Sequence, residues 1–151
     1  MTIQSFNIYT ARGYAGDLVD SGPNVSQTGV VEDAELQVGV AVRRGTLARD
    51  ITLDADGGNI FGLVRRELAL EAKNKPSDGE TVFKKHDSAS ILRQGYLYVE
   101  VVSSSVVAGQ LVFTDTDGHI TGSTGTATTN VTAEQDGIVG DIIRVRIDIV
   151  A

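Results

Sequence analysis

Residues Ile143–Ile149, with the sequence IRVRIDI, decide the fold of this chain. The side chains at 143, 145, 147 and 149 are isoleucine or valine, and the three between them are charged. Successive side chains of a β-strand point to opposite faces of a sheet, so this stretch has one apolar face and one charged face. The pattern predicts a half-buried β-strand.

Other stretches carry similar patterns. Leu36–Val42 alternates large apolar residues with Gln37, Gly39 and Ala41, which predicts one continuous strand. Residues 60–72 fit a strand better than a helix, because their apolar positions scatter around a helical axis. Thr126–Ala133 is interpreted as either a polar edge strand or a loop. Shorter strands are expected at Ile51–Leu53, Thr81–Lys84, Ala89–Leu92, Tyr96–Val102 and Val106–Thr114.

Four Asp-Gly pairs separate these runs. Asp and Gly both tolerate the positive φ angles of a tight type I′ turn, so each pair predicts a hairpin. No segment has a convincing helical pattern. The sequence therefore predicts an all-β protein, an antiparallel barrel-like or jelly-roll-like sandwich. The four pairs are Asp56-Gly57, Asp78-Gly79, Asp117-Gly118 and Asp136-Gly137.

The first part of the chain lacks sustained periodicity. Residues 1–10 predict a short strand, and residues 11–34 are interpreted as irregular. Long irregular segments in a small protein usually carry function or contact a partner. We therefore divide the chain into an N-terminal strand with an extended arm, residues 1–34, and a β domain, residues 35–151.

Charge and composition argue against several classes of function. The net charge of −7 disfavours general nucleic-acid binding, which needs a basic face toward the phosphates, and it disfavours an anionic membrane surface. Cysteine is absent, which excludes thiol catalysis and Cys-ligated zinc. Neither a secretory signal nor a run of about 18 apolar residues is visible, so no membrane partner is expected.

The sequence predicts no catalytic, cofactor-binding or metal site. His86 and His119 adjoin turn-like segments, so we expect both on the solvated surface. A hydrolytic triad could combine His86 with Ser88 or Ser103–Ser105, but no Gly-x-Ser-x-Gly motif is present.

Two acidic turns resemble calcium loops. They begin at Asp54 and Asp115, and an EF-hand loop needs a glutamate at its twelfth residue. Arg65 and Thr126 occupy those positions, so both segments are interpreted as plain turns.

Two short segments resemble motifs of dUTP pyrophosphatase, a trimeric enzyme. Ala15–Leu18 and Gly122–Gly125 are similar to parts of two of its motifs, but the motif with the water-activating carboxylate is absent. The basic pairs Arg43-Arg44 and Arg65-Arg66 are interpreted as salt-bridging surface residues rather than an anion site.

Several segments, taken in order, resemble the capsid cement (decoration) proteins of tailed bacteriophages. The glycine-rich arm comes first, strands follow, and the similarity covers most of the chain. An aromatic residue that the family commonly has near the first core strand is missing here. The segments are Ala15–Asn24, Val38–Val42, Ile60–Glu67, Gly79–Val82, Ile91–Val99, Val107–Val112 and Asp117-Gly118.

This resemblance implies a non-enzymatic virion protein on the capsid exterior, synthesised in the host cytoplasm. It implies binding to major capsid protein across subunit boundaries, and self-association as a homodimer or homotrimer. Other virion β modules (tail or head-completion) and a carbohydrate-binding module stay open as alternatives.

Apolar residues of the arm are the expected partner-binding residues, because exposed apolar groups in a polar segment favour an interface. An equal alternative is that Phe6 and Ile8 complete the core sheet. The expected partner-binding residues are Phe6, Ile8, Tyr9, Tyr14 and Leu18.

Overall fold

The computed structural model describes residues 15–19, 24–53, 60–66 and 82–148, and these contain β-strands and no helix. None of these residues belongs to a helix that could cross a bilayer. The strands are β1 (Val25–Val31), β2 (Glu35–Gln37), β3 (Ala41–Arg44), β4 (Asp50–Leu53), β5 (Gly62–Val64), β6 (Val82–Lys84), β7 (Ser88–Glu100), β8 (Leu111–Thr114), β9 (Ile120–Thr121), β10 (Thr126–Ala133) and β11 (Ile142–Asp148).

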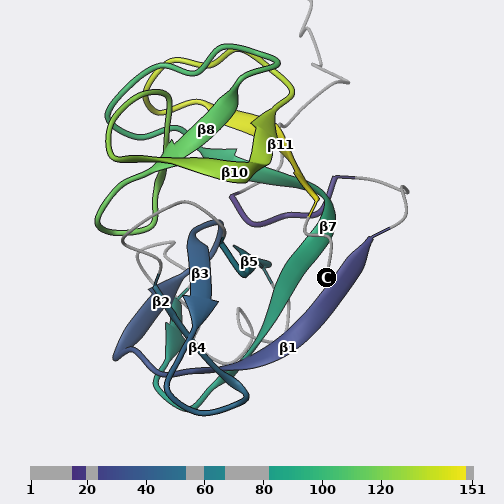
Figure 1. Ribbon diagram of the computed structural model, residues 1–151, viewed down its shortest axis with the longest axis vertical. Helices are drawn as coiled ribbons and strands as arrows, with labels where there is room; N and C mark the ends of the chain where they lie inside the picture. Colours follow the sequence, from purple (N-terminus) through teal and green to yellow (C-terminus); the bar gives the residue numbers. More distant parts are fainter. Residues whose placement is uncertain (1–14, 20–23, 54–59, 67–81, 149–151) are drawn as a thin grey trace, which may run out of the picture.

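Five strands close into a small barrel, drawn in the lower part of Figure 1. The order β1-β4-β3-β5-β7 returns to its start because β1 also pairs with β7. The closing pair β1–β4 is parallel and joins only Val30 with Asp50 and Val31 with Ile51. We call this part, with the first half of β7, the barrel lobe.

The rest of the sheet continues from β7 in the order β7-β11-β10-β8-β9. These strands form the upper part of Figure 1, and we call them, with the second half of β7, the C-terminal lobe. The all-β, barrel-like fold expected from the sequence is confirmed. Among the described strands, neighbouring strands pair antiparallel, except for the parallel pair β1–β4.

Strand β7 belongs to both lobes. Its first half pairs with β1, and its second half pairs with β11 from Gln94 to Glu100. The two expected strands Ala89–Leu92 and Tyr96–Val102 are therefore one strand of 13 residues. Gly95, with φ of +133°, lies near its middle, and this φ is one that side-chain-bearing residues rarely adopt.

Two apolar cores lie on opposite faces of β3, β5 and β7. Ala41, Leu63 and Leu92 align in one row of the sheet and belong to the core of the C-terminal lobe. Their sequence neighbours Val42, Val64 and Ile91 belong to the core of the barrel. Since successive side chains of a strand point to opposite faces, these three strands are buried on both sides. The C-terminal lobe therefore packs against the outside of the barrel.

A two-stranded sheet closes part of the barrel core. In it β2 pairs with β6, and Leu36 lies opposite Phe83, both almost completely buried. The prediction of one strand over Leu36–Val42 is wrong, because a turn between β2 and β3 interrupts the strand. Gly39 has a φ of +78°, which favours glycine, and its amide donates to the carbonyl of Val64.

The C-terminal strand is confirmed, with Ile143, Val145 and Ile147 buried; Ile149 lies outside the described residues. The prediction for residues 60–72 is confirmed at Gly62–Val64. Thr126–Ala133 is a strand, and it is internal, because β10 pairs with both β8 and β11. The expected strand Val106–Thr114 is shorter and begins at Leu111.

Two of the four Asp-Gly pairs can be compared with the structure. Asp117-Gly118 forms the turn between β8 and β9, as expected, and Gly118 has a φ of +74°. Asp136-Gly137 lies in the loop that joins the antiparallel strands β10 and β11, but the predicted tight turn is wrong: Gly137 pairs with Val106, and the Asp136 carboxylate accepts from the amide of Ala108. The other two pairs lie outside the described residues.

The stretch interpreted as irregular contains regular structure. Residues Val25–Val31 form β1, which pairs with β7 over most of its length. The first four residues of VSQTGVV are exposed and, apart from Val25, polar, and they show no alternating apolar face, so the strand character comes from the partners of this segment. The division of the chain at residue 34 stays a prediction.

We expect the two lobes to unfold together, because β3, β5 and β7 are shared by both cores. Ile91→Ala in the barrel core and Leu97→Ala in the other core should each lower the free energy of unfolding by about 2–5 kcal/mol. The exposed Leu47→Ala should change it by less than about 0.5 kcal/mol. Urea unfolding followed by circular dichroism and fluorescence tests this. Two separate transitions, each moved by only one core variant, would contradict the shared-core description.

Candidate functional site

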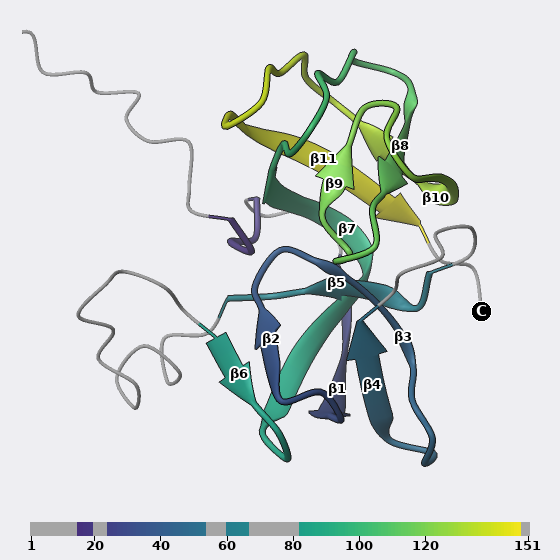
Figure 2. The same cartoon turned by 90° about the vertical axis from the view of Figure 1, so that its left-hand side faces the viewer.

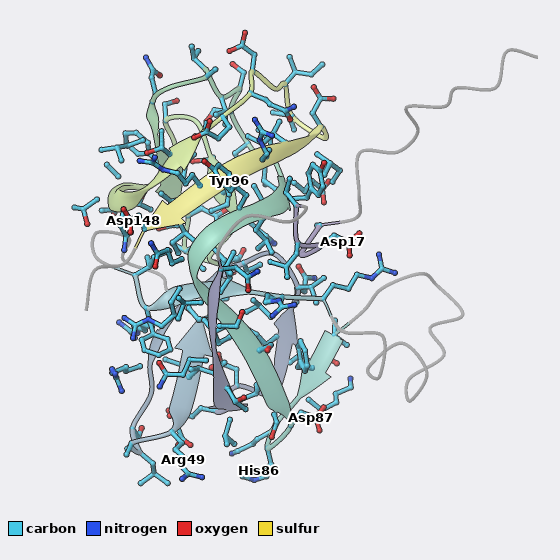
Figure 3. The ribbon with its side chains drawn as sticks, turned by 90° about the vertical axis from the view of Figure 1, so that its right-hand side faces the viewer. Asp17, Arg49, His86, Asp87, Tyr96 and Asp148 are labelled. Carbon is cyan, nitrogen blue, oxygen red and sulfur yellow. The ribbon has the colours of Figure 1, made fainter. Side chains whose placement is uncertain are left out.

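The root of the N-terminal arm is fixed to β7. The amides of Gly16 and Val19 donate to the carbonyls of Tyr98 and Tyr96, and the Tyr98 amide donates to Asp17. Leu18 bridges to Leu97 and packs partly buried against the core of the C-terminal lobe. Figure 3 shows Asp17 beside the sheet at the level where the two lobes meet. The other expected partner-binding residues, Phe6, Ile8, Tyr9 and Tyr14, lie outside the described residues.

A patch of exposed apolar side chains lies on the C-terminal lobe. It consists of Val107, Leu111, Ile138 and Val139, and we call it the apolar tip. Two backbone hydrogen bonds between Val106 and Gly137 hold its two loops together. The loops lie at the end of the molecule farthest from the barrel in Figure 2. Ile138 is 67% exposed, so the patch offers apolar surface to a partner.

A groove lies on the barrel lobe between β1 and the hairpin of β3 and β4. Its volume is about 230 Å³, smaller than the roughly 300–1,000 Å³ of pockets that hold drug-sized ligands. It can therefore take a few side chains but not a large cofactor. Its lining residues are Gln27, Thr28, Gly29, Val30, Arg44, Ala48, Arg49, Asp50, Ile51, Phe61 and Ser88.

Two arginines stack on Phe61 at this groove. The guanidinium carbons of Arg44 and Arg93 lie 4.7 and 4.2 Å from the centre of its ring. Arg93 also donates to the carbonyl of Phe61 and to the side chain of Gln27. Burial, followed by the nearby charge of Arg44, lowers the pKa of Arg93. A stack of this kind contributes about 0.5–1 kcal/mol at an exposed site.

The charge balance of the groove is positive although the chain is acidic. Arg44 and Arg49 line the groove, and Asp50 supplies the one carboxylate of the lining. Arg93 adds a third guanidinium group beside the groove, where it stacks on Phe61 and donates to Gln27. Within the described ranges, none of these arginines lies within 4 Å of a carboxylate oxygen. The interpretation of Arg44 as a salt-bridging residue is therefore wrong. Sequence reasoning missed Arg49, Phe61 and Arg93, which no motif connects.

Glu32 fastens the hairpin that carries Arg44 and Arg49. Its two carboxylate oxygens accept from the amide and the hydroxyl of Thr46, at 2.7 and 3.0 Å. These two hydrogen bonds, in that order, lower the pKa of Glu32. The turn is therefore held in place by a side chain on the segment that follows β1.

The two histidines lie in separate turns, one before β7 and one between β8 and β9. His86 is exposed, with a φ of +72° in the turn before β7, while the ring of His119 lies 3.2 Å from the side-chain oxygen of Gln37. The Ser104 hydroxyl accepts from the amides of Gly122 and Ser123, which is a structural role. Among the described residues, neither imidazole is hydrogen-bonded to a serine.

The acidic segment at Asp115 is a turn. One Asp115 oxygen accepts from the amides of Asp117 and His119, at 2.9 and 3.0 Å. Potential ligand atoms of these three residues lie within 4.8 Å of one another. Their hydrogen bonds account for the arrangement as a turn, and exposed acidic groups of this kind are common without a metal ion.

The segments that are similar to dUTP pyrophosphatase motifs serve the fold. Residues 15–18 pair with β7, as described above. Gly122 lies so close to the backbone of Ser105 that an added Cβ would stand 1.7 Å from its carbonyl oxygen. Glycine is thus required at position 122 for packing.

These observations define a compact β protein whose described surface offers places for protein contact. A family model described as structural cement protein (E217 gp24/Pam3 gp6) matches residues 3–148. The chain belongs to this family of phage cement proteins, so it is a structural virion protein that stabilises the capsid.

Solved structures share the fold at low sequence identity. A chain from the capsid of Myoviridae phage XM1 is 17% identical, with a TM-score of 0.64, covering 95% of this chain and 98% of that one. The head fiber gp8.5 N base of bacteriophage phi29 is 13% identical, with a TM-score of 0.55, covering 83% and 95%. No curated protein matches the sequence.

We expect Glu32→Gln to destabilise the protein at neutral pH, because glutamine cannot accept both hydrogen bonds from Thr46 through two oxygens. The pKa of Glu32 is lowered below 4.5 in the folded state. Its contribution is therefore complete above that pH and is lost as the pH falls through the folded value. Urea unfolding of both proteins at pH 7 and at about pH 3 should show the difference shrinking in acid. A difference that is equal at both pH values would contradict this role.

Proposed function

We propose that the chain binds the outer surface of an icosahedral phage capsid and bridges major capsid protein subunits without catalysing a reaction. The observation that carries this is the match to the structural cement protein family over residues 3–148. The fold likeness to a chain of the XM1 capsid supports it. Modest contacts are sufficient for such a protein, since many copies attach to one symmetric lattice.

The contact surfaces of this proposal are the arm and the apolar tip. Phe6, Ile8, Tyr9, Tyr14 and Leu18 are proposed to contact the shell or a neighbouring copy. The described part of the arm supports this, because its root lies fixed along β7 and gives a bound arm a rigid attachment. Self-association as a homodimer or homotrimer is part of the proposal.

A second candidate is the base of a larger capsid-attached assembly. The likeness to the head fiber base of phi29 favours it, because that protein combines a related fold with a place in a fiber. Both candidates require attachment to the shell. They differ in whether the bound protein carries a further protein outward.

Deletion of residues 1–14 should reduce binding to shells at least about tenfold and leave the fold intact, because residues 15–19 keep their hydrogen bonds to β7. Co-sedimentation with shells assembled from the major capsid protein of the same phage measures the affinity, and circular dichroism checks the fold. The control is His86→Asn, an exposed residue in the turn before β7 whose positive φ asparagine also tolerates. Undiminished binding by the folded truncated protein would contradict a role for the arm.

A further inference from the structure

The groove on the barrel lobe lies at the opening of a closed barrel. The amides of Val30 on β1 and of Glu32 directly after it donate to the carbonyls of Arg49 and Ile51, so even-numbered residues of β1 direct their backbone groups toward β4. Because β4 begins at Asp50, opposite Val30, it does not reach the earlier residues. In the described part of the chain, no strand pairs with this edge of Val25–Gly29.

If β4 began a few residues earlier in the chain, those residues would lie beside the free edge of β1. That space is the groove. Thr28 lines it, and the side chain is exposed. Ser26, two positions before Thr28, directs its backbone groups to the same edge. The Ser26 hydroxyl accepts a hydrogen bond from the Arg65 guanidinium. A short edge of strand with unpaired backbone groups is the surface to which an extended peptide can add as another strand.

Arg44 and Arg93 lie on barrel strands, close to residues of the barrel core. Arg44 follows the core residue Val42 by two positions on β3, and Arg93 follows the core residue Ile91 by two positions on β7. Arg44 therefore occupies the face that is apolar elsewhere. Arg93 lies where the pairing of β7 with β1 shifts register, and its guanidinium stacks on Phe61, which packs against the barrel core. Arginine stems can cover an apolar core, but two adjacent guanidinium groups without a carboxylate repel each other. A bound anion would relieve this repulsion.

We propose that the groove binds an extended acidic segment of the major capsid protein, which adds a strand to the free edge of β1 and places a carboxylate at Arg44, Arg49 and Arg93. This inference rests on the proposed function and names the chemistry of one contact. The small volume fits one or two acidic side chains. The net charge of −7 disfavours a nucleic-acid backbone in the same place.

Neighbouring residues of β3 provide a matched pair of variants. Arg44 faces the groove and Arg43 faces the other side of the strand, and both are exposed. Arg44→Gln and Arg43→Gln change the net charge equally. Arg49→Gln is a further groove variant, in an exposed turn residue that Figure 3 shows at the end of the barrel lobe.

Co-sedimentation of the full-length variants with shells of the same phage tests the proposal, with urea unfolding as the check of fold. We expect Arg44→Gln and Arg49→Gln each to weaken binding about tenfold, and Arg43→Gln to change it by less than about twofold. Raising the salt concentration should weaken wild-type binding more than that of the double groove variant. If Arg44→Gln fails to fold, Arg49→Gln decides.

Groove variants that bind like the wild type, or an equal loss with Arg43→Gln, would overturn the groove proposal and leave the proposed function standing. A wild-type protein that does not bind shells would overturn both. A benzophenone side chain in place of Thr28 identifies the occupant by photo-crosslinking. Crosslinks to an Asp- or Glu-containing segment of the shell protein are expected. Crosslinks to a second copy of this chain, to nucleic acid or to a segment without acidic residues would refute the proposal.

Discussion

The structure depends on the hydrogen bonding of β7 along both of its edges. One edge pairs with β1 and then with residues 16–19, while the other pairs with β5 and then with β11. Its side chains supply both cores, with Ile91 in the barrel and Leu92 in the C-terminal lobe. Because one strand holds both lobes and the root of the arm, force applied to one surface is carried to the others. This rigidity suits a protein that reinforces a shell.

The groove is a consequence of how the barrel closes. A closed barrel removes free strand edges, but here the last pair, β1–β4, joins only two residues on each strand. The remaining edge of β1 is left beside Arg44, Arg49 and the stacked Phe61. Closure thus creates a stable core and, at the same place, a short edge flanked by positive charge. The apolar tip and the arm lie on other parts of the surface.

The alternation of apolar and polar residues predicted the strands that are buried on one face only, such as β11. In such strands, every second side chain points into the core. The alternation was less useful for β1, whose first half is exposed and, apart from Val25, polar and whose structure comes from pairing with β7. The break at Gly39 depends on distant neighbours, as does the use of Asp136 as an acceptor for Ala108. The groove could not be predicted from the sequence for the same reason. Arg44, Phe61 and Arg93 are distant in sequence and come together only when the barrel closes.

The protein is proposed to attach to the exterior of the capsid as a rigid β module. A density map of the intact phage particle tests this most directly. We expect density for this fold on the outer surface, in contact with more than one major capsid protein subunit. Density inside the shell, in the tail, or over a single subunit without a bridge to its neighbours would contradict the account.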